Sequence, residues 1–168
     1  MEGSERAGAP RAVTGWRRGV RLGVDWGRAR IGVAACDPDG VLAYPVETVA
    51  QGPQAPERLA AVAAEYEAIE VVLGWPTSLR GDAGPAAEAM WEVAGRLVRV
   101  IGVPIRLVDE RLTTVTAARQ LSGVGRRRRD WSSVIDQVAA VEILQQALDT
   151  ERRTGHPAGR TIQTGEES

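Results

Sequence analysis

Residues 20–36 read VRLGVDWGRARIGVAAC, and this stretch decides the fold. The runs VRLGVD (20–25) and RIGVAAC (30–36) are rich in valine and small apolar residues, which predicts two buried strands. Because the link between them is short, we expect the two strands to pair antiparallel. The turn DPDG (37–40) has Pro second and Gly last, and it leads into a third strand at about 41–49. The first third of the chain therefore predicts a three-stranded antiparallel sheet.

Beyond residue 50 the pattern changes to helices that alternate with short buried strands. The expected elements are a helix at 56–68, a strand at 69–73, a helix at 85–101, a strand at 104–108, a short helix at 113–121 and a last helix at 131–149. Right-handed crossovers would place the two later strands parallel to the first. We therefore predict an α/β fold with a mixed five-stranded sheet, three antiparallel strands followed by two parallel ones, and helices on both faces.

The length of 168 residues suits one domain with tails. We expect a disordered N-terminal tail at 1–18, a single domain at 19–150 and a disordered C-terminal tail at 151–168. No apolar run has the length of a membrane span, and the N-terminus lacks the apolar core of a secretory signal. The single cysteine, Cys36, excludes an intrachain disulfide. We therefore expect a cytoplasmic protein with no membrane partner.

Histidine and cysteine are too scarce to carry the chemistry. The only histidine, His156, lies in the predicted tail, so neither a zinc site nor a Ser-His-Asp triad is expected. The net charge is −1, yet residues 1–36 and 101–130 each hold seven arginines against three acids. A nearly neutral total can hide a basic face, so nucleic acid stays open as a partner. The chemistry is expected to rest on carboxylates, arginines and the backbone.

Acids follow the carboxyl ends of two strands that are predicted to be parallel. Asp25 ends the first strand, and Asp109 and Glu110 follow the strand at 104–108. Ligands of open α/β sheets collect at this edge, so we expect these acids to line one cleft. Each acid also has a purely structural interpretation, because Asp25 can bond amides of its own turn and Glu110 can pair with Arg111.

Asp136 lies on the inner face of the last predicted helix. Helical spacing puts it on one stripe with Ala140, Ile143 and Ala147, so its carboxylate faces the protein. Ser133 as N-cap with Asp136 three residues later would also form a capping box, worth roughly 1 kcal/mol to the helix. Both interpretations can hold together.

Three carboxylates, those of Asp25, Glu110 and Asp136, would repel one another in a shared cleft unless a cation neutralised them. Oxygen ligands without His or Cys are typical of Mg²⁺ or Mn²⁺ sites. Such clusters often hold two ions about 4 Å apart, one preparing water and one steadying the leaving oxygen. We therefore predict a site with two Mg²⁺ or Mn²⁺ ions, in which these acids are both metal ligands and catalytic groups.

Arginines beside these acids suit a phosphate polymer. The candidate phosphate contacts are Arg30 and the run formed by Arg126, Arg127, Arg128 and Arg129, which precedes the helix of Asp136. A solvated loop is the competing interpretation of the run. Trp26, Trp75 and Trp131 border the same segments, and a base could stack on one of them, although tryptophans more often pack in a core.

Four segments, in order, resemble the YqgF (RuvX-like) family: LGVDWGRARIGVAACDPDG, VVLGWPTSLRGDAG, VDERLTT and VIDQVAAVEILQQAL. The resemblance covers about residues 20–150 and implies an RNase H-like fold. The residues that match the family's three acids and two recurrent arginines are Asp25, Glu110, Asp136, Arg30 and Arg111. Arg111 thereby joins the expected nucleic-acid contacts.

The resemblance implies a metal-dependent nuclease that hydrolyses phosphodiester bonds in 5′-end processing of pre-16S rRNA during ribosome biogenesis. Its partner would be structured RNA, and we expect a monomer or a weak homodimer. The first alternative is a Holliday junction resolvase, which must cut two strands symmetrically and is usually dimeric. The others are a non-catalytic RNA-binding ribosome-biogenesis factor and an actin-like or sugar-kinase-like nucleotide binder. The last encloses ATP between two such domains, and this chain has room for one.

Overall fold

The computed structural model describes residues 16–75, 85–109 and 128–162. The elements are, in order, β1 (Arg21–Trp26), β2 (Arg30–Cys36), β3 (Ala43–Ala50), α2 (Ala55–Glu65), β4 (Glu70–Trp75), α3 (Pro85–Val100), β5 (Ile105–Asp109), α5 (Arg128–Thr154) and β6 (Arg160–Thr161). The helix expected at 113–121 lies outside the described residues.

The strands form one mixed sheet in the order β3-β2-β1-β4-β5-β6. β1, β2 and β3 pair antiparallel, and β4 and β5 extend the sheet parallel to β1. This confirms the predicted topology. The prediction of five strands is wrong by one, because β6 adds a two-residue antiparallel strand beside β5. A strand this short has no alternation that a sequence pattern could reveal.

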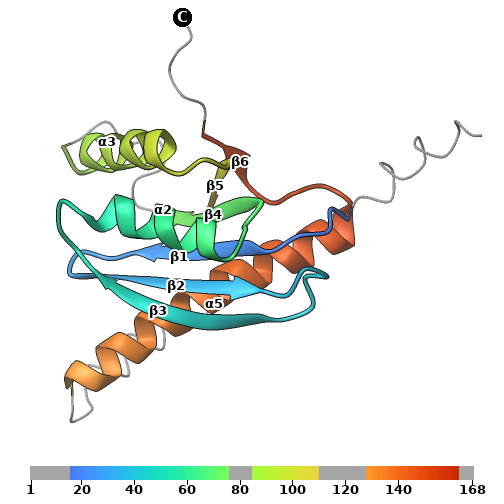
Figure 1. Cartoon of the computed structure of the whole chain (residues 1–168), viewed down its shortest axis with the longest axis horizontal. Helices are drawn as coiled ribbons and strands as arrows, with labels where there is room; N and C mark the ends of the chain where they lie inside the picture. Colours follow the sequence, from blue (N-terminus) through green and yellow to red (C-terminus); the bar gives the residue numbers. More distant parts are fainter. Residues whose placement is uncertain (1–15, 76–84, 110–127, 163–168) are drawn as a thin grey trace, which may run out of the picture.

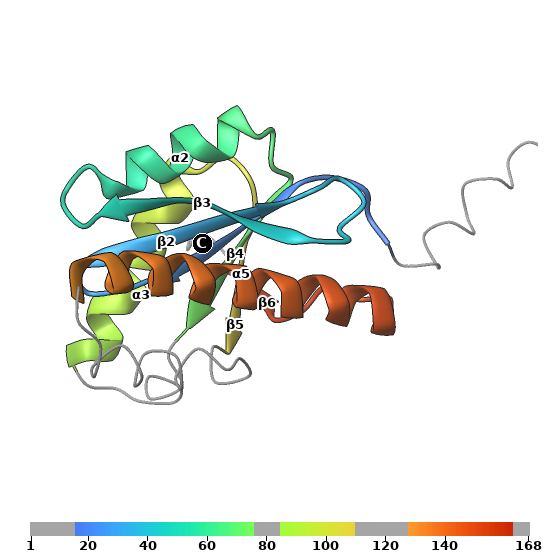
Figure 2. The same cartoon turned by 90° about the horizontal axis from the view of Figure 1, so that it is seen from below.

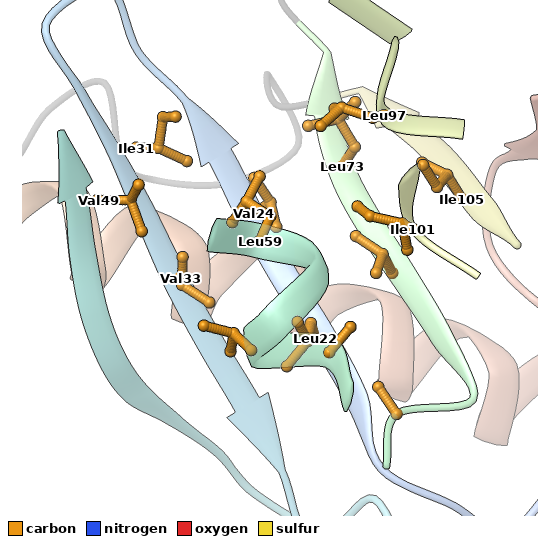
Figure 3. Packing of buried hydrophobic residues seen from close by; sticks show 14 of the residues in the cluster. Leu22, Val24, Ile31, Val33, Val49, Leu59, Leu73, Leu97, Ile101 and Ile105 are labelled. Carbon is orange, nitrogen blue, oxygen red and sulfur yellow. The ribbon is translucent and has the colours of Figure 1, made fainter. Parts of the chain in front are cut away.

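Helices cover both faces of the sheet, as predicted: α2 and α3 lie on one face and α5 crosses the other (Figures 1 and 2). Successive side chains of a strand point to opposite faces. Leu22 and Val24 of β1 therefore join the core beneath α2 and α3, where Figure 3 shows them beside Leu59. Gly23 and Asp25, which alternate with them, lie on the face that α5 covers.

Two glycines let α5 lie unusually close to the sheet. A Cβ atom at Gly23 of β1 would lie 2.7 Å from the carbonyl oxygen of Ala140, and one at Gly32 of β2 would overlap the carbonyl oxygen of Asp136. Side chains cannot be accommodated at such separations, so the helix backbone rests directly on the strands. α5 has 27 residues, but no described helix combines the length and apolar character that crossing a bilayer requires.

Both predicted tails contain ordered structure within the described residues. The disordered tail predicted at 151–168 is wrong for residues 151–162, because α5 continues to Thr154 and residues 160–161 form β6. At the other end, residues 16–18 were also expected to be disordered, yet Arg17 bonds two buried glutamates. The domain thus extends beyond the predicted boundaries on both sides.

A charge network holds these end segments to the sheet, on the α5 side and at the end where β1 begins. Its members are Arg17, Arg21, Glu70, Arg106 and Glu151. Glu151 accepts bonds from Arg17 Nη2 at 2.7 Å and Arg21 Nη2 at 3.1 Å. Glu70 accepts from Arg17 Nη2 at 3.0 Å and Arg106 Nε at 2.7 Å. Burial by itself would raise the pKa of Glu151, but the hydrogen bond from Arg17 and the charge of Arg21 hold that pKa below its ordinary value.

Candidate active site

Asp25 lies where β1 reaches the carboxyl edge of the sheet, on the face covered by α5. Its side chain is almost completely buried, with 2 % of the residue exposed. Its register partners are Gly32 in β2 and Gly74 in β4. Neither neighbouring strand therefore sets a side chain beside the carboxylate on this face. Burial of a carboxylate at the end of a strand is uncommon, and such buried acids are enriched at functional sites.

The packing of α5 sets Asp136 against β2, on the face of the sheet where Asp25 lies. It is 9 % exposed and shares its stripe with the buried Ala140, Ile143 and Ala147, as predicted. Its backbone carbonyl rests against Gly32, the cross-strand partner of Asp25. Opposite residues of an antiparallel pair have Cα atoms about 5 Å apart, so Gly32 is a near neighbour of both acids.

Arg30 supplies the positive charge at this place. Its Nε donates a hydrogen bond to Oδ2 of Asp136 at 2.9 Å. Arg30 stands two residues before Gly32 in β2, so both point to the α5 face. The side chain of Arg30 is 40 % exposed, whereas that of Asp136 is 13 % exposed. The guanidinium therefore partly offsets the repulsion between the acids while remaining accessible to a ligand.

A neighbouring bond fixes the helix in register with the sheet. Nε2 of Gln137 donates to the Thr48 hydroxyl oxygen in β3 at 2.8 Å. Thr48 pairs with Gly32, so it lies in the same cross-strand row as Asp25. The row places α5 over the carboxyl halves of β1 and β3 and the amino half of β2, and this sets the position of Asp136.

Several predicted site residues lie outside the described structure. These are Glu110, Arg111, Arg126 and Arg127. Arg128 and Arg129 begin α5, but their side chains are not described. The predicted cap is wrong: because α5 begins at Arg128, Ser133 is inside the helix and Asp136 is not at its third position. Trp26, one of the candidate stacking residues, packs against the core under α2 and α3.

The donor set fits a hard divalent cation. Asp25 and Asp136 offer only carboxylate oxygens, which Mg²⁺ and Mn²⁺ prefer. Within residues 16–75, 85–109 and 128–162, no group of three or more Asp, Glu, His or Cys side chains is placed to share an ion. The third predicted ligand, Glu110, falls in one of the gaps. The two described acids therefore fit part of the predicted site.

Sequence reasoning missed the bond between Arg30 and Asp136. It assigned Arg30 to phosphate alone, because a partner separated by 106 residues leaves no local pattern. A signal for the helix crossing was present in Gly32, since a glycine inside a strand often marks the close approach of another backbone.

Comparisons with known proteins agree with this architecture. The family model described as "RuvX: Holliday junction resolvase" matches residues 19–150. A Streptomyces avermitilis protein named "Putative pre-16S rRNA nuclease" is 56 % identical over 152 residues, which cover 89 % of this chain and 97 % of the relative. A Streptomyces coelicolor protein of the same name is 53 % identical over 163 residues, 95 % of each chain.

Among solved structures, Thermus thermophilus RuvC in complex with a Holliday junction substrate is similar, with a TM-score of 0.53. The match covers 86 % of this chain and 99 % of that one at 16 % identity, so it is evidence for the RNase H-like fold alone. The family model spans most of the sequence, from just before β1 to the last turns of α5. With the two close relatives, it confirms the resemblance drawn from the sequence motifs: the chain belongs to the RuvX family.

Proposed function

We propose that this chain is a metal-dependent nuclease that processes the 5′ end of pre-16S rRNA during ribosome biogenesis in the cytoplasm. The observation that supports the proposal is the ion pair of Asp136 with the accessible Arg30 on the α5 face of the sheet, the face on which the buried Asp25 also lies. Two buried acids and one accessible cation suit phosphodiester hydrolysis better than simple packing. Relatives more than 50 % identical over nearly their whole length carry the name of that activity.

Asp25, Asp136 and Glu110 are the proposed ligands of two Mg²⁺ or Mn²⁺ ions. Glu110 follows β5 in the sequence and lies outside the described residues, so its assignment as the third ligand rests on its match to the family's acid in VDERLTT. Divalent ions held here would supply Lewis-acid activation of the phosphodiester and of water.

Arg30 is proposed to have two successive roles. Before substrate binds, its bond to Oδ2 neutralises and orients Asp136 beside Asp25. When a phosphate of the substrate strand arrives, the accessible guanidinium can contact the phosphate oxygens. Arg111 and the Arg126–Arg129 run are proposed as further backbone contacts, and these contacts position the strand without reading its sequence.

Structured RNA is the proposed substrate rather than a four-way DNA junction. The junction is named for the family model and for a solved RuvC structure that is only 16 % identical to this chain. The pre-rRNA is named for relatives at 53 % and 56 % identity. Substrate preference depends on surface residues that differ between distant members of a fold, so the closer relatives weigh more.

The deciding experiment compares Asp25→Asn with wild type on an end-labelled pre-16S rRNA fragment and on a four-way DNA junction, with Mg²⁺ or Mn²⁺. We expect RNA cleavage to fall at least about a hundredfold, because a charged group at the reacting centre is lost. Asp39→Asn is the matched control, since Asp39 is an exposed acid paired with Arg18. Equal thermal melting of the two variants would show that the fold is kept.

Full turnover by Asp25→Asn would remove Asp25 from the catalytic site. Cleavage of the junction without cleavage of RNA would replace the proposed substrate by the DNA alternative. RNA binding with no cleavage by wild type under either ion would favour the non-catalytic ribosome-biogenesis factor.

A further inference from the structure

A groove of about 410 Å³ lies between α3 and the edge strand β6, on the sheet face opposite α5. Its lining includes Trp91 and Gly95 of α3, Leu107 of β5 and Arg160 of β6. The volume falls in the range of small-molecule sites, and most of its wall is apolar. The groove is separate from the proposed active site, because Asp25 and Asp136 lie on the other face of the sheet.

Trp91 presents ring surface to this groove. The residue is 46 % exposed, and the guanidinium carbon of Arg160 lies 6.0 Å from its ring centroid. Trp16 shows the contrasting arrangement, with Arg21 and Arg152 at 4.3 Å and 4.4 Å from its centroid. Arg160 therefore borders the ring of Trp91 without reaching the stacking contact seen at Trp16.

The helix side of the groove has room beside this ring. A Cβ atom at Gly95 would meet one atom within 4 Å, Nη1 of Arg99 at 3.7 Å. Arg160 is exposed and lines the groove, so a cation borders the aromatic face. That combination is typical of proteins that bind unpaired nucleotides, in which a base stacks on the ring and arginines contact the neighbouring phosphates.

The groove lies close to the edge where cleavage is proposed. Leu107 lines it, and β5 ends two residues later at Asp109, roughly 7 Å farther along the strand. Only β4 lies between β5 and β1, so the carboxyl end of β5 and Asp25 are about 10 Å apart across the sheet. These separations are of the length that a few nucleotides of extended strand can span.

We propose that this groove binds one unpaired base of the substrate RNA outside the cleaved bond, with the base stacked on Trp91 and its phosphate near Arg160. This inference rests on the proposed function, because the strand it holds is the strand that the nuclease cuts. It adds a binding subsite on the α3 face to the active site on the α5 face.

The test measures binding of a fluorescein-labelled single-stranded RNA in EDTA, so that no cleavage occurs. Trp91→Ala removes the stacking surface, and Gly95→Leu fills the groove while leaving Trp91 in place. Stacking is worth about 1–3 kcal/mol per base, so each variant should raise Kd roughly tenfold. Trp91→Phe keeps a ring and Gly95→Ala adds one methyl group, so these matched controls should bind nearly as wild type does.

A walk of abasic nucleotides along the same RNA then identifies the stacked base. At one position outside the cleaved bond, removal of the base should raise Kd as much as Trp91→Ala does. Combining that abasic position with Trp91→Ala should raise Kd no further than either change alone. Gly95→Leu replaces a helix glycine by a better helix former, so its melting temperature should not fall. This control separates blocked binding from lost folding.

Wild-type affinity in both Trp91→Ala and Gly95→Leu would overturn the groove while leaving the proposed function intact. If these two variants lost RNA binding while Asp25→Asn kept full cleavage, the groove would be supported and the assignment of Asp25 to the active site would be contradicted. If the variants changed the sedimentation coefficient of the protein and not its RNA affinity, the groove would be a contact between copies and the proposal would be wrong. Absence of RNA binding by wild type would overturn both proposals.

Discussion

Arg30 and Asp136 form an ion pair at the proposed active site. The bond is 2.9 Å long, and its two ends differ in exposure, with the acid largely buried and the cation open to solvent. An exposed pair would contribute little to stability, and a fully buried pair would be difficult to open. This intermediate pair can hold Asp136 in place and still release Arg30 to a phosphate.

Arg30→Gln should lower RNA cleavage by about 10- to 100-fold, because a charge that contacts the substrate strand is removed. Without the guanidinium, the acids should bind Mn²⁺ several-fold more tightly in the absence of nucleic acid, since a like charge has left. Titration calorimetry with Mn²⁺ measures the second effect without any turnover. Unchanged cleavage together with unchanged Mn²⁺ affinity would contradict both roles of Arg30.

At the scale of elements, the contact between α5 and β2 decides where Asp136 lies. The helix backbone touches the sheet at Gly32, so any side chain there would push α5 outward. The acid would move with the helix, away from Asp25. The spacing of the proposed active site thus depends on a residue that has no side chain.

Gly32→Ala should lower the free energy of unfolding by about 1–3 kcal/mol, as expected for overpacking, and should reduce cleavage as well. Gly102→Ala is the control, because a Cβ atom at Gly102 would meet nothing within 4 Å. Urea unfolding measures stability, and the RNA assay measures activity. If Gly32→Ala matched Gly102→Ala in both measurements, the close approach of α5 would not matter in solution.

The elements also show what sequence patterns can predict. Alternation and helical spacing predicted β1 to β5, α2, α3 and the buried stripe of α5, because these signals repeat within each element. The predicted start of α5 was wrong, because a Ser-x-x-Asp pattern is local and gives no sign that the helix already begins at Arg128. β6 was missed because its partner, β5, lies more than 50 residues away in the chain.

In the whole molecule, the charge network around Glu70 and Glu151 joins segments that are distant in sequence. Arg17 is 134 residues from Glu151 and 53 from Glu70. From the sequence alone, charged residues near the ends of a chain are interpreted as solvated tails, because their partners come near them only once the sheet has folded. The predicted domain therefore stopped short of the ordered residues at both ends. The position of Asp25 at the end of a strand, in contrast, followed from its local pattern.

Glu151→Gln should lower the free energy of unfolding at pH 7 by about 3 kcal/mol, because two arginines lose a buried partner. The pKa of Glu151 is depressed in the folded state, so its contribution is present above the unfolded pKa of about 4.3 and is lost as the pH falls through the lower folded value. The variant should therefore lose less stability than wild type between pH 5 and the acid limit. Thermal unfolding measured across pH tests this slope.

Glu47→Gln is the control for that comparison. Glu47 pairs with Arg58 at the surface, where solvent screens the charges, so its loss should have little effect at pH 7. Parallel pH profiles of wild type and Glu151→Gln would mean that the network does not contribute to acid unfolding.

The row formed by Leu22, Val71 and Ile105 ends at Ile162, whose backbone N–H donates to the carbonyl of Ile105. The first and last described segments thus meet the same edge of the sheet, three strand spacings or roughly 14 Å apart. A short glycine linker can bridge that span, and the exposed stretch at 52–54 between β3 and α2 offers a place to open the chain. The domain is accordingly a candidate for circular permutation, in which the connectivity changes and the arrangement of Asp25, Arg30 and Asp136 is preserved.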